Sequence, residues 1–337
     1  MKIGIPQSLL YFYYFPFWEE LFTELGQEVI VSEPNNEQIM NKGVKYSISE
    51  ICVPMKTFVG QVLELAEQGV DKIYVPRIRS IQEGVTLCPK FLGLPDMIIN
   101  SLDIEEEKIL VNTIEQDSDN ISDIEDYEVF LDEFDITRTQ LQEALSGASE
   151  RWQEFRRHHK KGFASDILLS DRERSLESSD LTIGLLGYVY NIYDKFVNMD
   201  LLGKLRDMDV NVITFEMIDD EVIQKEARKV EKRMFWEFTN KLLGAGYHFL
   251  KSDEIDGIIH VTAFGCGPDS LLGPFLDIDS DNYDKPFMTL RIDEQTGESH
   301  LVTRVEAFVD LLRLKKKKSK RGRKNSKNEA IGESERV

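Results

Sequence analysis

The chain has few cysteines and lacks the long apolar runs that a membrane protein requires. It contains 3 cysteines among 337 residues. An odd number of cysteines spread far apart is a poor disulfide framework and is typical of a reducing compartment. No apolar run approaches the roughly 20 residues that span a bilayer. Residues 1–5 lead straight into a strand-like segment, without the pattern of a secretory signal. We therefore expect a cytoplasmic protein with no membrane partner.

Several common catalytic motifs are also missing. The sequence has no G-x-x-x-x-G-K-S/T, no G-x-G-x-x-G after the first expected strand, no G-x-S-x-G and no H-E-x-x-H. These absences argue against a self-contained ATPase, a dinucleotide dehydrogenase and a serine hydrolase.

Positive charge is scarce except at one end of the chain. The formal net charge is −20, so the folded body should repel nucleic acid and anionic membrane surfaces. Lysines and arginines crowd into 315–324, and the residues after them are mostly polar. This composition predicts a disordered basic tail over 315–337. A solubilising or charge-balancing role is favoured for it, with binding of nucleic acid or a partner as the alternative.

Short apolar strands alternate with helical patterns along most of the chain, which predicts an α/β fold with parallel sheets. Strands are expected at 2–6, 29–32, 72–76, 108–114, 181–187, 210–215, 257–263 and 286–292. Helices are expected at 9–26 with a kink at Pro16, and at 36–46, 52–68, 89–102, 136–163, 193–208, 221–250, 268–277 and 302–314. We expect 77–87 to be a polar loop and 117–135 to be exposed. The helix at 221–250 is expected to break near its glycines, Gly244 and Gly246. The expected buried stripe of the helix at 136–163 is Leu141, Leu145, Trp152 and Phe155.

The two halves of the chain resemble each other weakly. The segment 2–6, Lys-Ile-Gly-Ile-Pro, aligns with 182–186, Thr-Ile-Gly-Leu-Leu, and 71–76 aligns with 256–261. The repeat predicts two Rossmann-like parallel-sheet lobes. The expected domains are an N-terminal lobe at 1–116, an acidic linker and helical segment at 117–180, a C-terminal lobe at 181–314 and the basic tail at 315–337.

The cysteines share a local pattern. Cys52, Cys88 and Cys266 are each followed within two residues by a proline, and each precedes a helix-like stretch. Proline is tolerated in a first helical turn, whose free amides and dipole favour a thiolate. Ligands bind beyond the carboxyl ends of parallel strands, where Cys88 and Cys266 are expected. We therefore predict that the cysteines lie in a cleft between the lobes.

Three thiolates leave the chemistry open. A structural zinc needs a fourth protein ligand, and among the histidines only His260 is close in sequence to a cysteine. An iron–sulfur cluster tolerates three protein thiolates with one iron left open, and proline beside a ligand cysteine is common in such loops. The alternative is three unrelated buried cysteines that act as small hydrophobes.

Other residues give weaker signals. Lys56 lies one helical turn after Cys52 and could face the same site. Arg77 and Arg79 could bind a phosphate or carboxylate, although solvated surface arginines are the favoured alternative.

Residues near the third cysteine have ordinary structural explanations. His260, inside an apolar strand, is expected to be a satisfied core histidine. Asp269 and Ser270 are expected to be residues of a helix N-terminus.

Five segments resemble the DUF2229 proteins, a group related to CoA enzyme activases. They are 4–18, 88–96, 263–270, 293–298 and 301–308. That group is similar to the cluster-bearing subunits of 2-hydroxyacyl-CoA dehydratases and of benzoyl-CoA-type reductases. The resemblance extends over residues 1 to about 314 and leaves out the acidic segment 117–135 and the basic tail.

The resemblance implies a 4Fe–4S cluster with one open iron, held between two Rossmann-like halves by Cys52, Cys88 and Cys266. It also implies low-potential electrons from a separate actin-like ATPase, a dehydratase-like partner subunit, and an acyl-CoA-type or other substrate. The ATPase domain is absent from this sequence. We therefore do not expect the chain to hydrolyse ATP.

Three hypotheses remain. The chain is a cluster-bearing enzyme component, a non-catalytic cluster protein that relays electrons or acts as a scaffold, or a metal-free α/β interaction protein. Lys56, Arg77 and Arg79 are weak candidates for binding anionic substrate groups. A roomy cavity beside the open iron, lined by the loop after Arg77, would favour catalysis, whereas a sealed site would favour relay.

Overall fold

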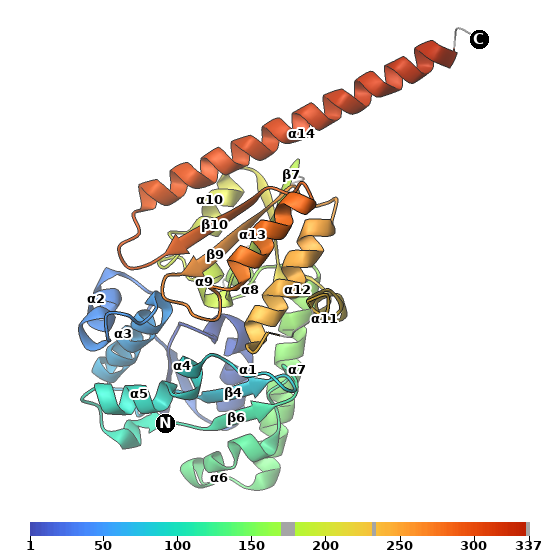
Figure 1. Ribbon diagram of the computed structural model, residues 1–337. Coiled ribbons are helices and arrows are strands. Elements are labelled where there is room, and N and C mark those ends of the chain that lie inside the picture. Colours follow the sequence, from blue (N-terminus) through green and yellow to red (C-terminus); the bar gives the residue numbers. More distant parts are fainter. Residues whose placement is uncertain (170–178, 231–233, 335–337) are drawn as a thin grey trace.

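The structure is a computed structural model that describes residues 1–169, 179–230 and 234–334. Figure 1 shows two α/β lobes, one above the other, with the long helix α7 (Arg138–Lys160) along one side of both. The sheets are parallel, so the predicted fold class of two parallel-sheet lobes is confirmed.

The N-terminal lobe is built on a four-stranded sheet in the order β2-β1-β3-β5. Its strands are β1 (Lys2–Ile5), β2 (Glu28–Val31), β3 (Lys72–Tyr74) and β5 (Ile109–Leu110). Its helices are α1 (Tyr11–Glu24), α2 (Glu37–Tyr46), α3 (Val53–Gln68), α4 (Pro89–Leu92), α5 (Leu94–Ser101) and the 3-10 turn η1 (Glu106–Lys108).

The C-terminal lobe is built on a second four-stranded sheet in the order β10-β9-β7-β8. Its strands are β7 (Leu181–Leu186), β8 (Val210–Thr214), β9 (Gly257–Ala263) and β10 (Phe287–Ile292). Its helical elements are α9 (Val189–Tyr193), α10 (Leu201–Asp207), η3 (Phe215–Met217), α11 (Asp220–Ala227), α12 (Glu237–Lys251), α13 (Leu272–Asn282) and α14 (Glu298–Ser334).

The two sheets have the same topology. In each, the first strand lies at the centre, the second pairs on one side, the third pairs on the other, and the last lies beyond the third. A hydrogen bond is repeated as well. The Lys2 amide donates to Asp71 Oδ2 at 2.7 Å, and the Thr182 amide donates to Asp256 Oδ2 at 2.9 Å. These pairs lie at the positions that the sequence repeat aligns.

A third, two-stranded sheet was not expected. It pairs β4 (Arg77–Ile81) with β6 (Thr113–Gln116), although 77–87 was predicted to be a polar loop and 108–114 a single strand. The register shifts between Ile78 and Ser80, which marks a β-bulge. A bulge interrupts the alternation of side chains on which strand prediction depends.

The acidic segment 117–135 is less exposed than predicted. It contains η2 (Ile124–Tyr127) and α6 (Val129–Phe134). Ile121, Tyr127 and Phe130 are fully buried in the core, so this acidic stretch is anchored by scattered apolar residues. The helix that follows, α7, buries the predicted stripe of Leu141, Leu145, Trp152 and Phe155. Residues 170–178, at the end of the expected linker and helical segment 117–180, lie outside the described residues.

Several helix boundaries differ from the prediction. α1 continues through Pro16, and the segment 193–208 forms only the end of α9 and the short α10. The helix predicted at 221–250 is interrupted between α11 and α12 rather than at its glycines. Gly244 lies where α12 meets α11, since a Cβ there would be 2.1 Å from the Ile223 carbonyl oxygen. The glycine therefore permits close helix packing.

Helix α14 continues where the sequence predicted a disordered tail. Its first half is anchored on the C-terminal lobe by five buried side chains: Leu301, Val305, Phe308, Val309 and Leu312. Beyond them the helix runs through the basic residues to Ser334 and projects from the body (Figure 1). Lysine and arginine are good helix formers, and no proline stops the helix. Lys316 pairs with Asp256 at 2.6 Å, which ties the start of the basic run to the lobe.

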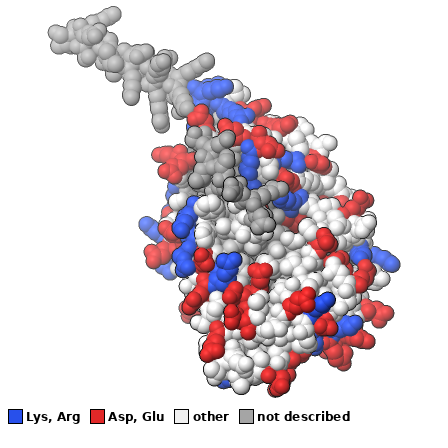
Figure 2. All heavy atoms as spheres, turned by 180° about the vertical axis from the view of Figure 1, so that it is seen from behind, with Lys and Arg blue, Asp and Glu red and all other residues white. Residues whose placement is uncertain are grey.

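The surface carries charges of both signs. Figure 2 shows acidic and basic side chains interspersed over one face of the molecule. Within the described residues, no helix is both long enough and apolar enough to cross a membrane.

Candidate functional site

Two of the three cysteines occupy equivalent local positions. Cys52 is the N-cap of α3 and Cys88 is the N-cap of α4, and both have extended backbone angles, with φ −66° and −62° and ψ 150° and 152°. The predicted arrangement of cysteine, proline and helix is confirmed there. Cys266 differs, because a turn separates it from α13, which starts at Leu272. The third thiol is therefore held by a loop rather than by a helix N-terminus.

Contacts connect the three cysteine segments. The Lys90 ammonium, on α4, donates to Cys52 Sγ at 3.4 Å. A Cβ at Gly265, next to Cys266, would lie 3.2 Å from the carbonyl oxygen of Glu50. Gly265 has a φ of 75°, a conformation that glycine adopts without strain. The loops of both lobes therefore meet close to the cysteines.

The thiols are also close enough to interact electrostatically. Burial raises the pKa of the Tyr190 hydroxyl, and negative charge on any of the three cysteines would raise that pKa further. Tyr190, on α9, lies 6.3 Å from the ring of Phe91 on α4, measured between ring centroids. Aromatic side chains from both lobes, Phe91 and Tyr190, therefore lie close together near the cysteines.

The pKa values of two thiols are raised, although the sequence predicted that helix N-termini would favour their thiolate forms. Burial raises the pKa of Cys88, although backbone amides of α4 oppose this effect. Burial also raises the pKa of Cys266, and the nearby Asp269 carboxylate adds to the shift. Desolvation therefore outweighs the helix N-terminus. A thiolate at either position needs a positive partner such as a metal.

The described residues contain no group of three or more His, Cys, Asp or Glu side chains arranged to hold a single metal ion. A single zinc draws its sulfur ligands to about 2.3 Å. A cluster of several irons spaces its ligand cysteines further apart, because each sulfur binds a different iron. Backbone amides that reach the Cys88 and Cys266 sulfurs, and the Lys90 ammonium that reaches Cys52, would suit ligands of such a cluster.

Lys56 is directed at the opposite lobe. Its ammonium pairs with Glu294 at 2.5 Å and donates to the Ser49 carbonyl at 3.0 Å. The lysine side chain is only 3% exposed. Lys56 follows Cys52 by one helical turn, as predicted, and its partner Glu294 comes from the loop after β10.

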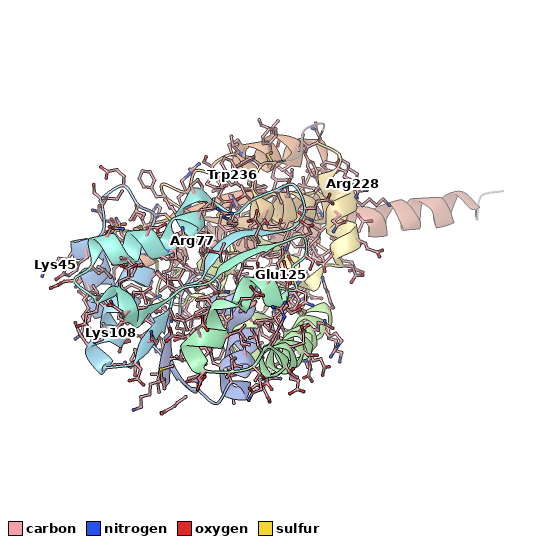
Figure 3. The ribbon with its side chains drawn as sticks, turned by 90° about the horizontal axis from the view of Figure 1, so that it is seen from below. Lys45, Arg77, Lys108, Glu125, Arg228 and Trp236 are labelled. Atoms are coloured by element: carbon pink, nitrogen blue, oxygen red, sulfur yellow. The ribbon has the colours of Figure 1, made fainter. Side chains whose placement is uncertain are left out.

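The two candidate arginines are paired with carboxylates of their own lobe. Arg77, at the start of β4 (Figure 3), binds Asp96 through two hydrogen bonds of 2.6 and 2.9 Å. Arg79 pairs with Glu115 at 2.8 Å, and both of those side chains are exposed. An anionic ligand at either arginine would have to displace a carboxylate.

A cavity of about 350 Å³ lies beside Cys266 at the carboxyl end of β9. His260 and Asp269 line it, and His260 Nε2 is 3.0 Å from Asp269 Oδ1. The sequence predicted a satisfied core histidine, but His260 Nδ1 has no hydrogen-bond partner. The sequence also missed Lys90 and Tyr190. Their positions, just after Cys88 and just after β7, were the available signals.

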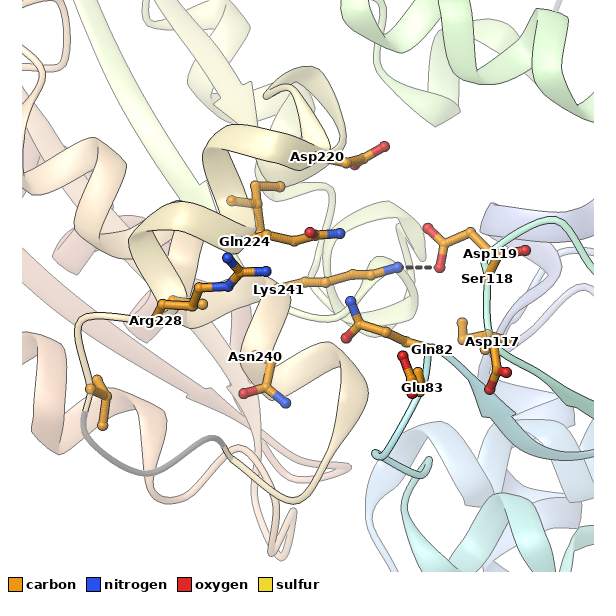
Figure 4. Close-up of a pocket in the computed structure, with 14 residues that line it drawn as sticks. Gln82, Glu83, Asp117, Ser118, Asp119, Asp220, Gln224, Arg228, Asn240 and Lys241 are labelled. Carbon is orange, nitrogen blue, oxygen red and sulfur yellow. Dashed lines mark hydrogen bonds and ion pairs between the residues drawn. The ribbon is translucent and has the colours of Figure 1, made fainter.

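A larger cavity of about 590 Å³ lies between the lobes, where β4 and β6 end. In Figure 4, Lys241 reaches across it from α12 to Asp119, which also accepts a hydrogen bond from the Tyr13 hydroxyl at 2.7 Å. Burial alone would raise the pKa of Asp119, but the charges of Lys241 and Arg156 hold it below its usual range. This buried ion pair joins the lobes.

The loop that carries Cys88 is fastened to the C-terminal lobe. The Thr86 amide donates to the Phe235 carbonyl at 3.3 Å, and the Glu237 amide donates to the Thr86 carbonyl at 3.0 Å. Gln82, in the same loop, lines the larger cavity. The backbone therefore connects this cavity directly to the segment before Cys88.

Comparison with known proteins gives one family. The model of DUF2229, described as the CoA enzyme activase uncharacterised domain, matches residues 2–218. This chain belongs to that family. The match includes Cys52 and Cys88 and ends before Cys266. No curated protein matches the chain.

Proposed function

We propose that the protein is an iron–sulfur protein that works with a separate CoA enzyme activase. In this proposal the chain accepts low-potential electrons from an ATP-hydrolysing partner and passes them to an acyl-CoA-type or other substrate, beside a dehydratase-like subunit. Family membership supports the link to CoA enzyme activation. The chain has no phosphate-binding motif of its own, which is consistent with a separate ATPase.

One observation carries the proposal. Three cysteines far apart in the sequence lie in segments that contact one another: Lys90, two residues after Cys88, donates to Cys52 Sγ at 3.4 Å, and Gly265, next to Cys266, passes close to the Glu50 carbonyl. Cys52 and Cys88 come from the N-terminal lobe, and Cys266 comes from the C-terminal lobe. Three unrelated core cysteines have no reason to share one neighbourhood, whereas the ligands of one inorganic centre do.

In this proposal Cys52, Cys88 and Cys266 hold a 4Fe–4S cluster with one open iron. The cluster supplies one-electron chemistry. The chain supplies the surroundings: Lys90 donates to Cys52 Sγ, and the aromatic side chain of Tyr190 limits access of water. Hydrogen bonds to the sulfurs and exclusion of solvent both tune a cluster's potential.

The cavity beside Cys266 favours an enzyme component over an electron relay or scaffold. At about 350 Å³ it has room for a small ligand next to a proposed cluster ligand. Its lining comes from β9, β10 and α13 rather than from the loop after Arg77. A site that only passed electrons would need no such space.

Anaerobic purification, with iron and sulfide assays and EPR of the reduced protein, tests the proposal. We expect about four irons and four sulfides per chain, with a cluster signal on reduction. Iron at background level in protein never exposed to air would contradict it.

Substitution tests the ligands. Cys88→Ala should abolish the cluster signal, because Cys88 is one of three protein ligands. Ser101→Ala is the matched control, since Ser101 is a small exposed residue at the end of α5. Full iron content in Cys88→Ala would show that Cys88 is not a ligand.

A further inference from the structure

Four polar side chains form a patch on one face of the C-terminal sheet. In the parallel pair of β9 and β10, His260 lies opposite Thr289, and Thr262 lies opposite Arg291. Because successive side chains of a strand point to opposite faces, all four share one face. The residues between them are apolar. We call these four residues the polar patch.

Helix α13 runs close over the polar patch. A Cβ at Gly273 would lie 3.2 Å from His260 Nδ1 and 3.7 Å from Thr289 Oγ1, so the helix backbone passes near both side chains. The cavity of about 350 Å³ is enclosed by the patch, by α13 and by the turn that contains Cys266.

His260 and Asp269 form a buried pair with unused hydrogen-bonding capacity. Each residue is only 1% exposed. The carboxylate of Asp269 can only accept a hydrogen bond, so the 3.0 Å contact assigns the proton to His260 Nε2 and leaves Nδ1 as an acceptor. His260 Nδ1 and Asp269 Oδ2 have no hydrogen-bond partner. Buried polar atoms are nearly always paired, so two unpaired atoms beside a cavity indicate a ligand.

Arg291 supplies the positive charge of the cavity. Its side chain is exposed and lines the cavity, and no carboxylate among the described residues pairs with it. The carboxylate of Asp269 lies in the same lining. A ligand with one negative charge is therefore favoured over a dianion, which Asp269 would repel.

We propose that this cavity binds a small monocarboxylate that also carries an N–H or O–H donor. The Arg291 guanidinium pairs with the carboxylate, and the hydroxyls of Thr262 and Thr289 lie beside it. His260 Nδ1 accepts the hydrogen bond from the ligand's donor, while Asp269 fixes the imidazole in the required tautomer. The inference goes beyond the proposed function and does not require bound iron.

Titration calorimetry on the full chain tests the inference with three matched probes. N-acetylglycine has both the carboxylate and an N–H donor. N-acetylglycinamide lacks the negative charge, and N-acetylsarcosine lacks the donor. We expect N-acetylglycine to bind and the other two to bind at least about tenfold more weakly. Absence of N-acetylglycine binding at about 10 mM, equal affinity for all three, or tighter binding of inorganic phosphate would overturn the inference.

Two exposed cations give a matched pair of variants. Arg291→Gln should weaken N-acetylglycine binding by about tenfold or more, because it removes a charge-assisted contact. Lys195→Gln, elsewhere on the C-terminal lobe, is the control and should bind like the wild type. Both residues are exposed, so both variants should fold. Unchanged affinity in Arg291→Gln would overturn the inference.

A spectroscopic readout separates binding by His260 from a structural role. In ¹⁵N-labelled protein, the His260 Nδ1 resonance should move on addition of N-acetylglycine and stay in place with N-acetylsarcosine. Identical shifts with both probes would contradict the proposed hydrogen bond. Iron is assayed on the same samples. If N-acetylglycine binds to protein that lacks iron, only the cluster proposal is contradicted. If the protein holds a full cluster but does not bind N-acetylglycine, only this inference is contradicted.

Discussion

The two lobes share a scaffold but not their chemistry. Both sheets have the same strand order, and both repeat the hydrogen bond from the first strand to an aspartate before the third. The N-terminal lobe places Cys52 and Cys88 at helix N-caps. The C-terminal lobe places Cys266 in a turn, beside a buried histidine–aspartate pair and a cavity. The repeat therefore reproduces the backbone and leaves the loops beyond the strands free to differ.

Equivalent glycines show how far the lobes have diverged in packing. A Cβ at Gly4 in β1 would come within 3.1 Å of the Leu65 and Val70 side chains. A Cβ at Gly184 in β7 would come within 2.5 Å of the buried Phe249 ring. The C-terminal lobe is thus packed more tightly at this position. Four predictions test the comparison between the lobes.

The largest effect is expected for Gly184→Ala. The new methyl group must displace a buried aromatic ring, and overpacking of this kind should lower the free energy of unfolding by about 3 kcal/mol. Gly4→Ala, the matched variant of the other lobe, meets only aliphatic side chains and should cost about 1 kcal/mol or less. Urea unfolding measures both values. Equal losses would refute the difference in packing.

The next effect depends on pH and lies at the junction of the lobes. Asp194 accepts hydrogen bonds from Asn35 at 2.5 Å and from the amides of Phe196 and Val197. Burial nevertheless raises the pKa of Asp194 to about 6. The folded state thus binds this proton more tightly than the unfolded chain, whose aspartates titrate near about 3.9. The associated stability is complete below about pH 4 and is lost as the pH rises through about 6.

Asp194→Asn removes this dependence. The free energy of unfolding of the wild type, relative to the variant, should fall by roughly 2 kcal/mol between about pH 4 and pH 7.5. Urea unfolding of both proteins across this range measures the change. A difference between the two proteins that does not change with pH would show that Asp194 is not the titrating group.

A smaller difference should separate the two repeated hydrogen bonds. Asp256→Ala removes an acceptor for the Thr182 amide and an ion pair with Lys316, and it should cost about 1.5 kcal/mol. Asp71→Ala removes only an exposed acceptor for the Lys2 amide and should cost about 0.5 kcal/mol. Thermal unfolding of both variants measures the two losses of stability. A larger loss for Asp71→Ala would reverse the expected ranking.

The smallest effect on stability is expected for a variant of Arg79, which was predicted from the sequence as a weak candidate for binding anionic substrate groups. Arg79→Gln removes an exposed pair with Glu115 and should change the free energy of unfolding by less than about 0.5 kcal/mol. Its effect on N-acetylglycine binding should be nil, because Arg79 does not line the cavity beside Cys266. Weakened binding would show that Arg79 is coupled to the cavity beside Cys266.

Regular elements were the most predictable part of the fold. β9 was predicted with its observed bounds, and the buried stripe of α7 was correct in all four residues. Both signals are local, because apolar periodicity is visible in a short window. β4 was missed because its bulge breaks the alternation between Ile78 and Ser80. The proposed domain boundaries and the cluster ligands stay predictions.

The candidate site was less predictable, because its contacts join distant residues. No local pattern pairs Lys56 with Glu294 or fastens Thr86 to the start of α12. The His260–Asp269 pair needs the turn after β9 to fold back onto the strand. Sequence reasoning therefore identified the cysteines by their type and spacing, and missed the partners that only the three-dimensional structure supplies.

The pairing of Lys56 with Glu294 limits how the molecule can move. Separating the two lobes would break this ion pair and would expose the Lys56 ammonium, whose side chain is now only 3% exposed. Lys56 lies one turn after Cys52 on α3, so that motion would also disturb the helix that positions the Cys52 thiol. We expect small molecules to reach Cys266 through the cavity of about 350 Å³ beside α13, without separation of the lobes.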